Sequence, residues 1–312
     1  MKATPKGFCS QFLTWPHDVV IIVNSCDAYS DLWDLFFLCM SDYWGGCDYP
    51  IVLNTESKIY SLPIGMNFDV SVHHYESGNA DLWGARLIST LNDTSAKFII
   101  MLFDDYFLNG PVDQERLKAL VDLMSDAQDV DVAYLIKLPC PQTGSIREDG
   151  LAVIAPNVDY RLNSAPAIWR KEALLKFTGR KDNPWAWEYF GSYRTFSDSS
   201  TFLKIADSEH DIYPYDYRKG GAIYRGKWVL EVISSIIEKH HLDLDIQKRG
   251  TDDSSCYPKR SLAWKYSFVM TGVQMIGPRI FSALYRIFRV KALSWLKKRK
   301  SANHETRITT QI

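Results

Sequence analysis

An unbroken apolar run at residues 19–23, VVIIV, constrains the fold of this chain more than any other feature. Polar residues enclose it on both sides, and a run that is apolar at every position is typical of a strand buried on both faces of a parallel sheet. Similar runs follow at residues 50–53, 97–103 and 130–136, and segments with helical spacing separate them at residues 32–40, 82–91 and 112–126. Strands that alternate with helices in this way predict an open α/β sheet.

The second half of the chain has a less regular pattern. Residues 151–154 are predicted to form a further strand, and residues 170–177 a helix. Residues 181–192, KDNPWAWEYFGS, are dense in aromatic side chains and turn formers. A glycine-rich loop at residues 219–228, KGGAIYRGKW, precedes a predicted helix that ends near residue 240.

Acidic side chains follow two of the predicted strands directly. Asp27 lies in the loop after the first strand, and Asp104 and Asp105 follow residues 97–103. Ligands of open α/β sheets bind outside the carboxyl ends of the strands. Two adjacent carboxylates are costly to bury, and Mg²⁺ or Mn²⁺ prefers such oxygen ligands together with substrate phosphates. The pair therefore predicts a metal and phosphate site, with a helix cap or turn at Asp104 as the alternative.

Charge is distributed very unevenly along the chain. Residues 1–257 carry 24 Lys and Arg against 36 Asp and Glu, a net charge of −12, whereas residues 258–300 carry eleven Lys and Arg and no acid. Within residues 279–300, basic Arg286, Arg289 and Lys291 alternate with apolar side chains, namely Ile280, Leu284, Ile287, Phe288 and Trp295. A basic amphipathic helix of this kind predicts binding to an anionic membrane surface. Docking of the helix on the acidic body is the alternative, and a nucleic-acid patch is disfavoured.

Composition excludes several other classes of protein. The chain is 46% apolar, which excludes a disordered protein. Its six cysteines form no CxxC and no cluster with zinc spacing, so reduced thiols are expected. No secretory signal and no run of 18 apolar residues is present, so we expect a cytoplasmic protein that is peripheral at the inner face of the cell membrane.

Three segments together resemble the GT-A-fold glycosyltransferases. KFIIMLFDDYF resembles their acidic motif, and VVIIVNSCDAYSDLW resembles their first strand and nucleotide-contacting loop. YRLNSAPAIWRKEAL followed by NPWAWEYFGS resembles the acceptor half of bacterial family-2-like transferases of capsule, O-antigen and lipopolysaccharide synthesis. The resemblance covers roughly residues 17–250. It implies a GT-A-type, open, mostly parallel sheet flanked by helices, plus the C-terminal basic amphipathic helical segment.

The resemblance also implies a domain organisation and a reaction. Residues 1–257 are expected to form the catalytic domain, with a donor half at about 17–140 and an acceptor half at about 141–257. Residues 258–300 form the membrane-associating segment, and residues 301–312 a polar tail. The expected reaction moves a sugar from a nucleoside-diphosphate donor to a glycan or lipid-linked glycan acceptor, with inversion at the anomeric carbon. No nucleic-acid partner is expected.

Roles for individual residues follow from the same resemblance. Glu188 is the predicted general base, and Trp185 and Trp187 beside it are predicted to contact the acceptor. The metal ligands are predicted to be Asp104 and Asp105, with Mn²⁺ or Mg²⁺ as the cofactor. The predicted donor-binding residues are Asp27, Tyr29, Arg86, Asp104, Arg225 and Lys227.

One residue departs from the family pattern and keeps two alternatives open. The usual motif is Asp-X-Asp, but Tyr106 stands where the last acid is expected, so the metal site is atypical. A nucleotidyltransferase could share the sheet and the acidic ligands, although it normally has a basic, glycine-rich loop after its first strand, where this chain has NSCDAYS. A non-catalytic, membrane-associated scaffold on a degenerate GT-A domain is the third hypothesis.

Overall fold

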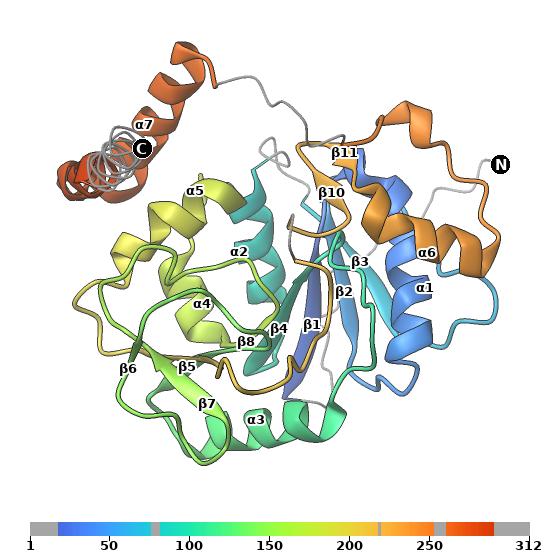
Figure 1. Cartoon of the computed structure of the whole chain (residues 1–312), viewed down its shortest axis with the longest axis horizontal. Helices are drawn as coiled ribbons and strands as arrows, with labels where there is room; N and C mark the ends of the chain where they lie inside the picture. Colours follow the sequence, from blue (N-terminus) through green and yellow to red (C-terminus); the bar gives the residue numbers. More distant parts are fainter. Residues whose placement is uncertain (1–17, 76–81, 218–219, 253–259, 290–312) are drawn as a thin grey trace, which may run out of the picture.

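A nine-stranded sheet forms the centre of the molecule in the computed structural model, which describes residues 18–75, 82–217, 220–252 and 260–289. The strands lie in the order β3-β2-β1-β4-β8-β5-β9-β7-β6 (Figure 1). Their bounds are β1 Val19–Asn24, β2 Ile51–Thr55, β3 Val70–His74, β4 Phe98–Phe103, β5 Val130–Tyr134, β6 Gln142–Thr143, β7 Leu151–Ile154, β8 Ala167–Arg170 and β9 Thr201–Ile205.

Strands β3, β2, β1 and β4 form a parallel block. Every residue of β1 and β2 is buried, as expected for strands covered on both faces. Asn24 at the end of β1 is in register with Asn54 of β2 and Phe103 of β4. The loops that follow these three strands therefore meet at one edge of the sheet.

Strand β8 separates this block from the rest of the sheet. It is antiparallel to both β4 and β5, whereas β9 is parallel to β5. Strand β7 is antiparallel to β9 and to β6, so only β8 and β7 run against the other strands. This arrangement confirms the predicted open, mostly parallel α/β sheet.

Helices flank the sheet, with α1 and α6 on the right in Figure 1 and α4 and α5 on the left. Side chains at their first turns set where some of them begin. Asp113 accepts a hydrogen bond from the Arg116 backbone N–H at 3.1 Å and caps α3, and Asn183 caps α5 in the same way. The helices are α1 Trp33–Tyr43, α2 Trp83–Asp93, α3 Gln114–Asp126, α4 Lys171–Phe177, α5 Pro184–Tyr189, α6 Leu230–His240 and α7 Leu262–Ile276.

The C-terminal segment packs on the body through a second apolar cluster, separate from the core around the sheet. The buried residues of this cluster are Ala186, Tyr189, Phe190, Tyr193, Ile276, Ile280 and Ala283. Helix α7 and the helical residues 280–289 lie against α5 and the following turn, residues 191–194 (Figure 1). Ile280 is buried there, and Leu284 and Ile287 pack against the cluster, so these side chains face the protein. The prediction that they face a membrane is therefore wrong, and Phe288 alone of the described set is exposed.

The remaining residues of that predicted amphipathic helix, including Lys291 and Trp295, lie outside the described residues, as does the tail at 301–312. Within the described ranges, no helix combines the length and apolar character needed to cross a membrane.

Candidate active site

The acidic pair occupies a turn at the carboxyl end of β4. Asp104 is 4% exposed, and its carboxylate accepts a hydrogen bond from the Ser25 hydroxyl in the loop after β1. The indole Nε1 of Trp33 donates to that same hydroxyl oxygen at 2.7 Å. Burial raises the pKa of Asp104 to about 7. Burial, together with the neighbouring Asp104 carboxylate, raises the pKa of Asp105 well above its ordinary value.

Asp27 links the loop after β1 to the end of β2 and the loop that follows it. Its carboxylate accepts hydrogen bonds from the backbone N–H groups of Ser57 and Lys58, each at 3.0 Å, and from the hydroxyls of Thr55 and Ser57. Burial opposes ionisation, but these donors outweigh it and hold the pKa of Asp27 well below its usual range. A role in reading the donor base or ribose remains a prediction, because Asp27 already has these four donors.

Arg86 supports the loop after β1 from within the protein. The residue is 2% exposed, and its guanidinium donates to the Ser25 carbonyl at 2.9 Å and pairs with the Glu56 carboxylate at 3.2 Å. Since Ser25 also holds Asp104, Arg86 positions the acidic pair indirectly. The structure thus places Arg86 behind the loop, and the predicted contact with a diphosphate is untested.

A cation that sequence reasoning missed lies next to the acidic pair. Arg249 donates from Nε to the Asp31 carboxylate at 2.6 Å, and its guanidinium lies 4.6 Å from the ring centroid of Tyr29 and 5.7 Å from that of Trp228. Its charge helps to lower the pKa of Asp104 against the effect of burial. Arg249 is 218 residues from Asp31, so no local pattern could indicate this contact.

The glycine-rich loop contacts the backbone of the acidic pair. The Ala222 N–H donates to the Asp105 carbonyl at 2.8 Å. Gly221 has a φ of +115°, and a Cβ there would lie 2.6 Å from the same carbonyl oxygen. Arg225 and Lys227 follow as exposed residues of a hairpin formed by β10 (Ile223–Tyr224) and β11 (Lys227–Trp228), whose Ile223 and Trp228 are buried. Their predicted contact with donor phosphates remains a prediction.

Glu188 lies at the end of a short hydrogen-bonded chain that leads to Tyr106. The Glu188 carboxylate, on α5, accepts from the backbone N–H of Ser164 at 2.8 Å and from the Ser164 hydroxyl at 2.5 Å. That hydroxyl lies 3.1 Å from the hydroxyl of Tyr106. Burial raises the pKa of Glu188, although the bonds from Ser164 partly offset this effect. Tyr106 thus connects the two groups of carboxylates that the sequence predicted to share a site.

The two tryptophans beside Glu188 have different environments. Trp187 is completely buried, its Nε1 donates to the Phe177 carbonyl at 3.2 Å, and its ring lies 5.6 Å from those of Trp83 and Trp169. A contact between Trp187 and an acceptor is therefore excluded, because this side chain is part of the core. Trp185 is 73% exposed and is available for such a contact.

The acidic pair fits a divalent cation that takes its other ligands from substrate. The two acids are adjacent in the chain, with Asp104 buried and Asp105 partly buried, and among the described residues no side chain donates a hydrogen bond to the Asp105 carboxylate. The described ranges contain no cluster of three or more His, Cys, Asp or Glu that could hold a metal. Mg²⁺ is commonly bound by one or two carboxylates plus substrate phosphates and water.

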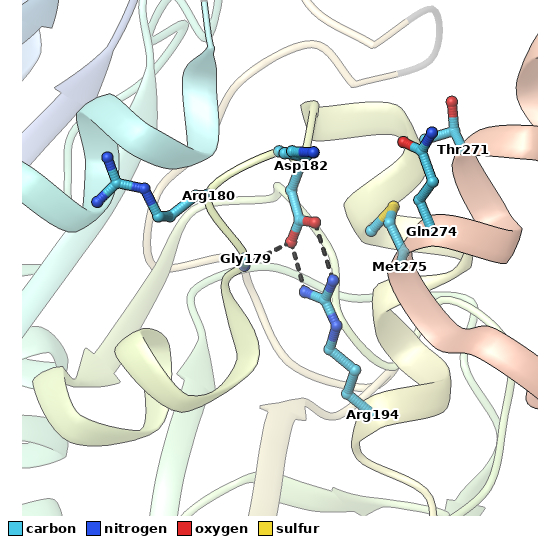
Figure 2. Close-up of a pocket in the computed structure, with 8 residues that line it drawn as sticks. Gly179, Arg180, Asp182, Arg194, Thr271, Gln274 and Met275 are labelled. Carbon is cyan, nitrogen blue, oxygen red and sulfur yellow. Dashed lines mark hydrogen bonds and ion pairs between the residues drawn. The ribbon is translucent and has the colours of Figure 1, made fainter. Parts of the chain in front are cut away.

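A cavity of about 210 Å³ lies apart from these residues, between the α4–α5 connection and α7. Figure 2 shows the paired Asp182 and Arg194 at its centre, with Arg180 directed away from them. It is lined by Gly179, Arg180, Lys181, Asp182, Arg194, Thr271, Gln274 and Met275. None of these is a predicted site residue.

Comparison with known proteins gives likenesses of fold at low identity. No protein-family model matches the chain, and no curated protein matches it. TarS of S. aureus (residues 1–349) is 13% identical over 85% of this chain and 82% of its own, with a TM-score of 0.44. CMP:2-keto-3-deoxy-manno-octonic acid synthetase is 14% identical over 63% and 93%, with a TM-score of 0.36. A mycobacterial protein is 9% identical over 74% and 77%, with a TM-score of 0.41.

Proposed function

We propose that the chain is a glycosyltransferase that moves a sugar from a nucleoside-diphosphate donor to a hydroxyl group of a glycan. The observation that carries this proposal is the position of Tyr106 between the acidic pair, which it follows in the chain, and Glu188, to which Ser164 links it. Asp104 and Asp105 form an acidic pair with raised pKa values on one side, and Glu188 is linked to Tyr106 through Ser164 on the other. The first group suits a metal and a diphosphate, and the second suits a proton acceptor.

On the donor side, Asp104 and Asp105 would hold Mn²⁺ or Mg²⁺. When bound, such an ion offsets negative charge on the diphosphate leaving group. Arg249 lies close enough to the pair to influence the ionisation of Asp104, and it is stacked between Tyr29 and Trp228. We infer that this cation and the hairpin with Arg225 and Lys227 contact the donor phosphates.

On the acceptor side, Glu188 takes the proton from the attacking hydroxyl. The hydroxyl oxygen forms a bond to the anomeric carbon, the bond from that carbon to the phosphate oxygen breaks, and the diphosphate leaves with the electron pair. A single displacement of this kind inverts the configuration. Burial raises the pKa of Glu188, which makes it a stronger base than an exposed glutamate. Trp185, exposed on the same helix, offers a ring on which a sugar can stack.

The acceptor we propose is a glycan carried on a lipid, in bacterial surface polysaccharide synthesis such as that of capsule or lipopolysaccharide. This follows from the family resemblance and from the basic C-terminal segment.

A donor panel tests the function. The full chain with Mn²⁺ is mixed with UDP-, GDP-, TDP- and CMP-sugars, and thermal stabilisation and slow donor hydrolysis are measured. We expect one nucleotide class to stabilise the wild type and the Asp126→Ala variant, which loses an exposed acid on α3, but not Asp105→Ala. No response to any donor, with Asp105→Ala behaving like wild type, would favour the scaffold hypothesis.

The nucleotidyltransferase hypothesis is tested with nucleoside triphosphates and sugar phosphates, by assaying pyrophosphate release. We disfavour it because residues 24–30 contain no glycine and no Lys or Arg, and residues 27–32 form a 3-10 helix in place of a phosphate-binding loop. Pyrophosphate release without sugar transfer to a glycan would replace our proposal with this one.

A further inference from the structure

Helix α7 is apolar on the side that faces away from the protein. Its inner face packs on the body through Phe268, Gly272 and Ile276. Trp264 is exposed beside this inner face and stacks on Phe268. Four further large apolar side chains are exposed with spacings of four, four and three residues, which places these four together on another face of the helix. They are Leu262, Tyr266, Met270 and Val273.

The helical residues 280–289 repeat this arrangement. Ile280, Ala283, Leu284 and Ile287 belong to or pack against the cluster on α5. Phe281, Tyr285 and Phe288 recur at spacings of four and three residues on the outer side, and Phe281 is 75% exposed and Phe288 68%. These three residues, with the four of α7, are called the outer apolar face below. Since both inner faces pack on the same cluster, both outer stripes are directed away from the body.

The outer apolar face lies in the one part of the chain with a strong positive charge. Residues 260–289 contain five Lys and Arg and no Asp or Glu, whereas residues 1–257 have a net charge of −12. Arg279 and Arg286 bind carbonyl oxygens of the body, at 2.7 and 2.9 Å. The other three cationic side chains of this stretch are exposed: Arg260, Lys265 and Arg289.

The charge distribution favours an anionic lipid surface over a second copy of the chain as the partner of this face. Two copies of the chain that paired symmetrically through it would bring like charges together, which is unfavourable. An anionic lipid surface attracts the cations of this segment and repels the acidic remainder of the molecule. Aromatic side chains with Lys and Arg beside them are also characteristic of helices that lie in a membrane interface.

We propose that the outer apolar face docks the protein on an anionic lipid bilayer, with α7 and residues 280–289 lying in the interface. The surface differs from the sequence-based prediction, because Ile280, Leu284 and Ile287 hold the segment to the body and Phe281 and Tyr285 take their place on the outside. Docking in this sense does not depend on the proposed transferase activity.

The same contacts link the docked segment to the candidate base. A Cβ on Gly272 would lie 2.7 Å from the Phe190 ring, and the Tyr189 hydroxyl donates to the Ala283 carbonyl at 3.2 Å. Both aromatic residues directly follow Glu188. If the transferase proposal holds, the membrane-bound segment holds the acceptor helix close to the lipid surface, which suits a lipid-linked acceptor.

Vesicle co-sedimentation of the full chain tests the docking. We expect wild type to pellet with vesicles of mixed phosphatidylglycerol and phosphatidylcholine, and several-fold less with vesicles of phosphatidylcholine alone. The double variant Phe281→Ser/Phe288→Ser should lose pelleting with the mixed vesicles. The control Ile146→Ser, which removes an exposed apolar side chain in the connection between β6 and β7, should pellet like wild type.

Two outcomes would overturn the proposal: equal binding of wild type and the double variant, or equal binding to both kinds of vesicle. Sedimentation equilibrium provides a further check, because a wild-type dimer that the double variant abolishes would make this face a self-association surface. Stabilisation by the nucleotide-sugar donor should be unchanged in the double variant. If no nucleotide-sugar donor stabilises wild type or any variant, that result contradicts the transferase proposal and leaves the docking proposal unaffected.

Discussion

Burial of the Asp104 carboxylate has an energetic cost when that carboxylate is ionised. Burial raises its pKa to about 7 in the folded protein, against about 3.9 in an unfolded chain. The folded state therefore binds more protons than the unfolded state between these values. The contribution of Asp104 to stability is fully present below about pH 4 and is lost as the pH rises through 7.

Asp104→Asn should consequently stabilise the protein in EDTA at pH 8. At about 1.4 kcal/mol per pKa unit, the gain is roughly 4 kcal/mol at most, and it should shrink towards pH 5. Urea unfolding at the two pH values measures it, with Asp126→Asn as the control. A gain that is equal at pH 5 and pH 8 would show that ionisation of Asp104 is not its cause.

Glu188 should govern the pH dependence of sugar transfer. Because burial raises its pKa, we expect kcat/KM to rise with pH to a plateau that lies above the range of an ordinary glutamate. Glu188→Gln should abolish this rise and lower the rate by about 10²–10⁴-fold, while leaving donor stabilisation unchanged. Steady-state rates across pH measure both effects, and an unchanged profile would exclude Glu188 as the base.

Trp185 and Trp187 offer an internal comparison on one helix. Trp187→Ala removes a fully buried ring and should cost about 3–5 kcal/mol of stability, whereas Trp185→Ala should change stability by less than about 0.5 kcal/mol. Trp185→Ala should instead raise the KM for the acceptor. Urea unfolding and acceptor titration separate the two results, and equal destabilisation would contradict the assignment.

The sequence indicates residues of the candidate site only where they belong to a local pattern. Asp104 and Asp105 end an apolar strand, and Glu188 lies in a segment that resembles a known family. The sequence did not reveal that residues 184–189 form a helix, in which side chains two positions apart point about 200° apart. Trp185 and Trp187 therefore point to different sides of α5 and cannot both contact one acceptor. Arg249 reaches the candidate site only through contacts made across the folded molecule.

At the scale of elements, a strand can be predicted from its apolar run when both of its faces are buried. Strand β4, residues 19–23 of β1 and residues 51–53 of β2 are continuous apolar runs because these strands are covered on both sides. Strand β3, VSVHH, lies at the sheet edge and is only half-buried, so it has no such run. Strand β9 contains Lys204, whose buried ammonium donates to the Leu138 carbonyl at 2.8 Å. Because this lysine interrupts the apolar run, the sequence pattern does not predict the strand.

The contact between the loop before the β10–β11 hairpin and the Asp105 carbonyl can be tested with two glycine variants. Gly221→Ala would bring a Cβ within 2.6 Å of the Asp105 carbonyl, whereas a Cβ on Gly220 meets nothing within 4 Å. Both glycines have positive φ, so the backbone strain of the two substitutions is similar. We expect Gly221→Ala to weaken donor binding by tenfold or more, corresponding to about 1.4 kcal/mol, and Gly220→Ala to have a smaller effect. Calorimetric titration with the donor compares them, and equal affinities would refute a role for this contact.

At the scale of the whole molecule, the C-terminal segment is bound to the α/β body by a shared core. Tyr189, Phe190 and Tyr193 of the body pack with Ile276 and Ile280 of the segment. Each buried side chain of this size contributes about 1.5–3 kcal/mol relative to its exposed state. The boundary predicted between residues 257 and 258 separates an acidic part of the chain from a basic one. The second apolar cluster contains residues from both sides of this boundary.

Removal of residues 258–312 should then destabilise the rest of the chain. We expect a lower Tm and increased binding of a hydrophobic dye, because Phe190 and Tyr193 lose their cover. Differential scanning calorimetry measures the change, with a chain lacking only residues 301–312 as the control. An unchanged Tm would mean that the segment is an independent appendage.

The position of β8 also has a consequence for the order in which the chain can assemble during synthesis. Strands β1 to β4 are contiguous in sequence and pair with one another, so this block can form once residue 103 has left the ribosome. Strand β5 is made next but has no partner in the block, since β8 must first be inserted between β4 and β5. For the time needed to translate the intervening residues, the nascent chain exposes an apolar strand edge that a chaperone would have to shield.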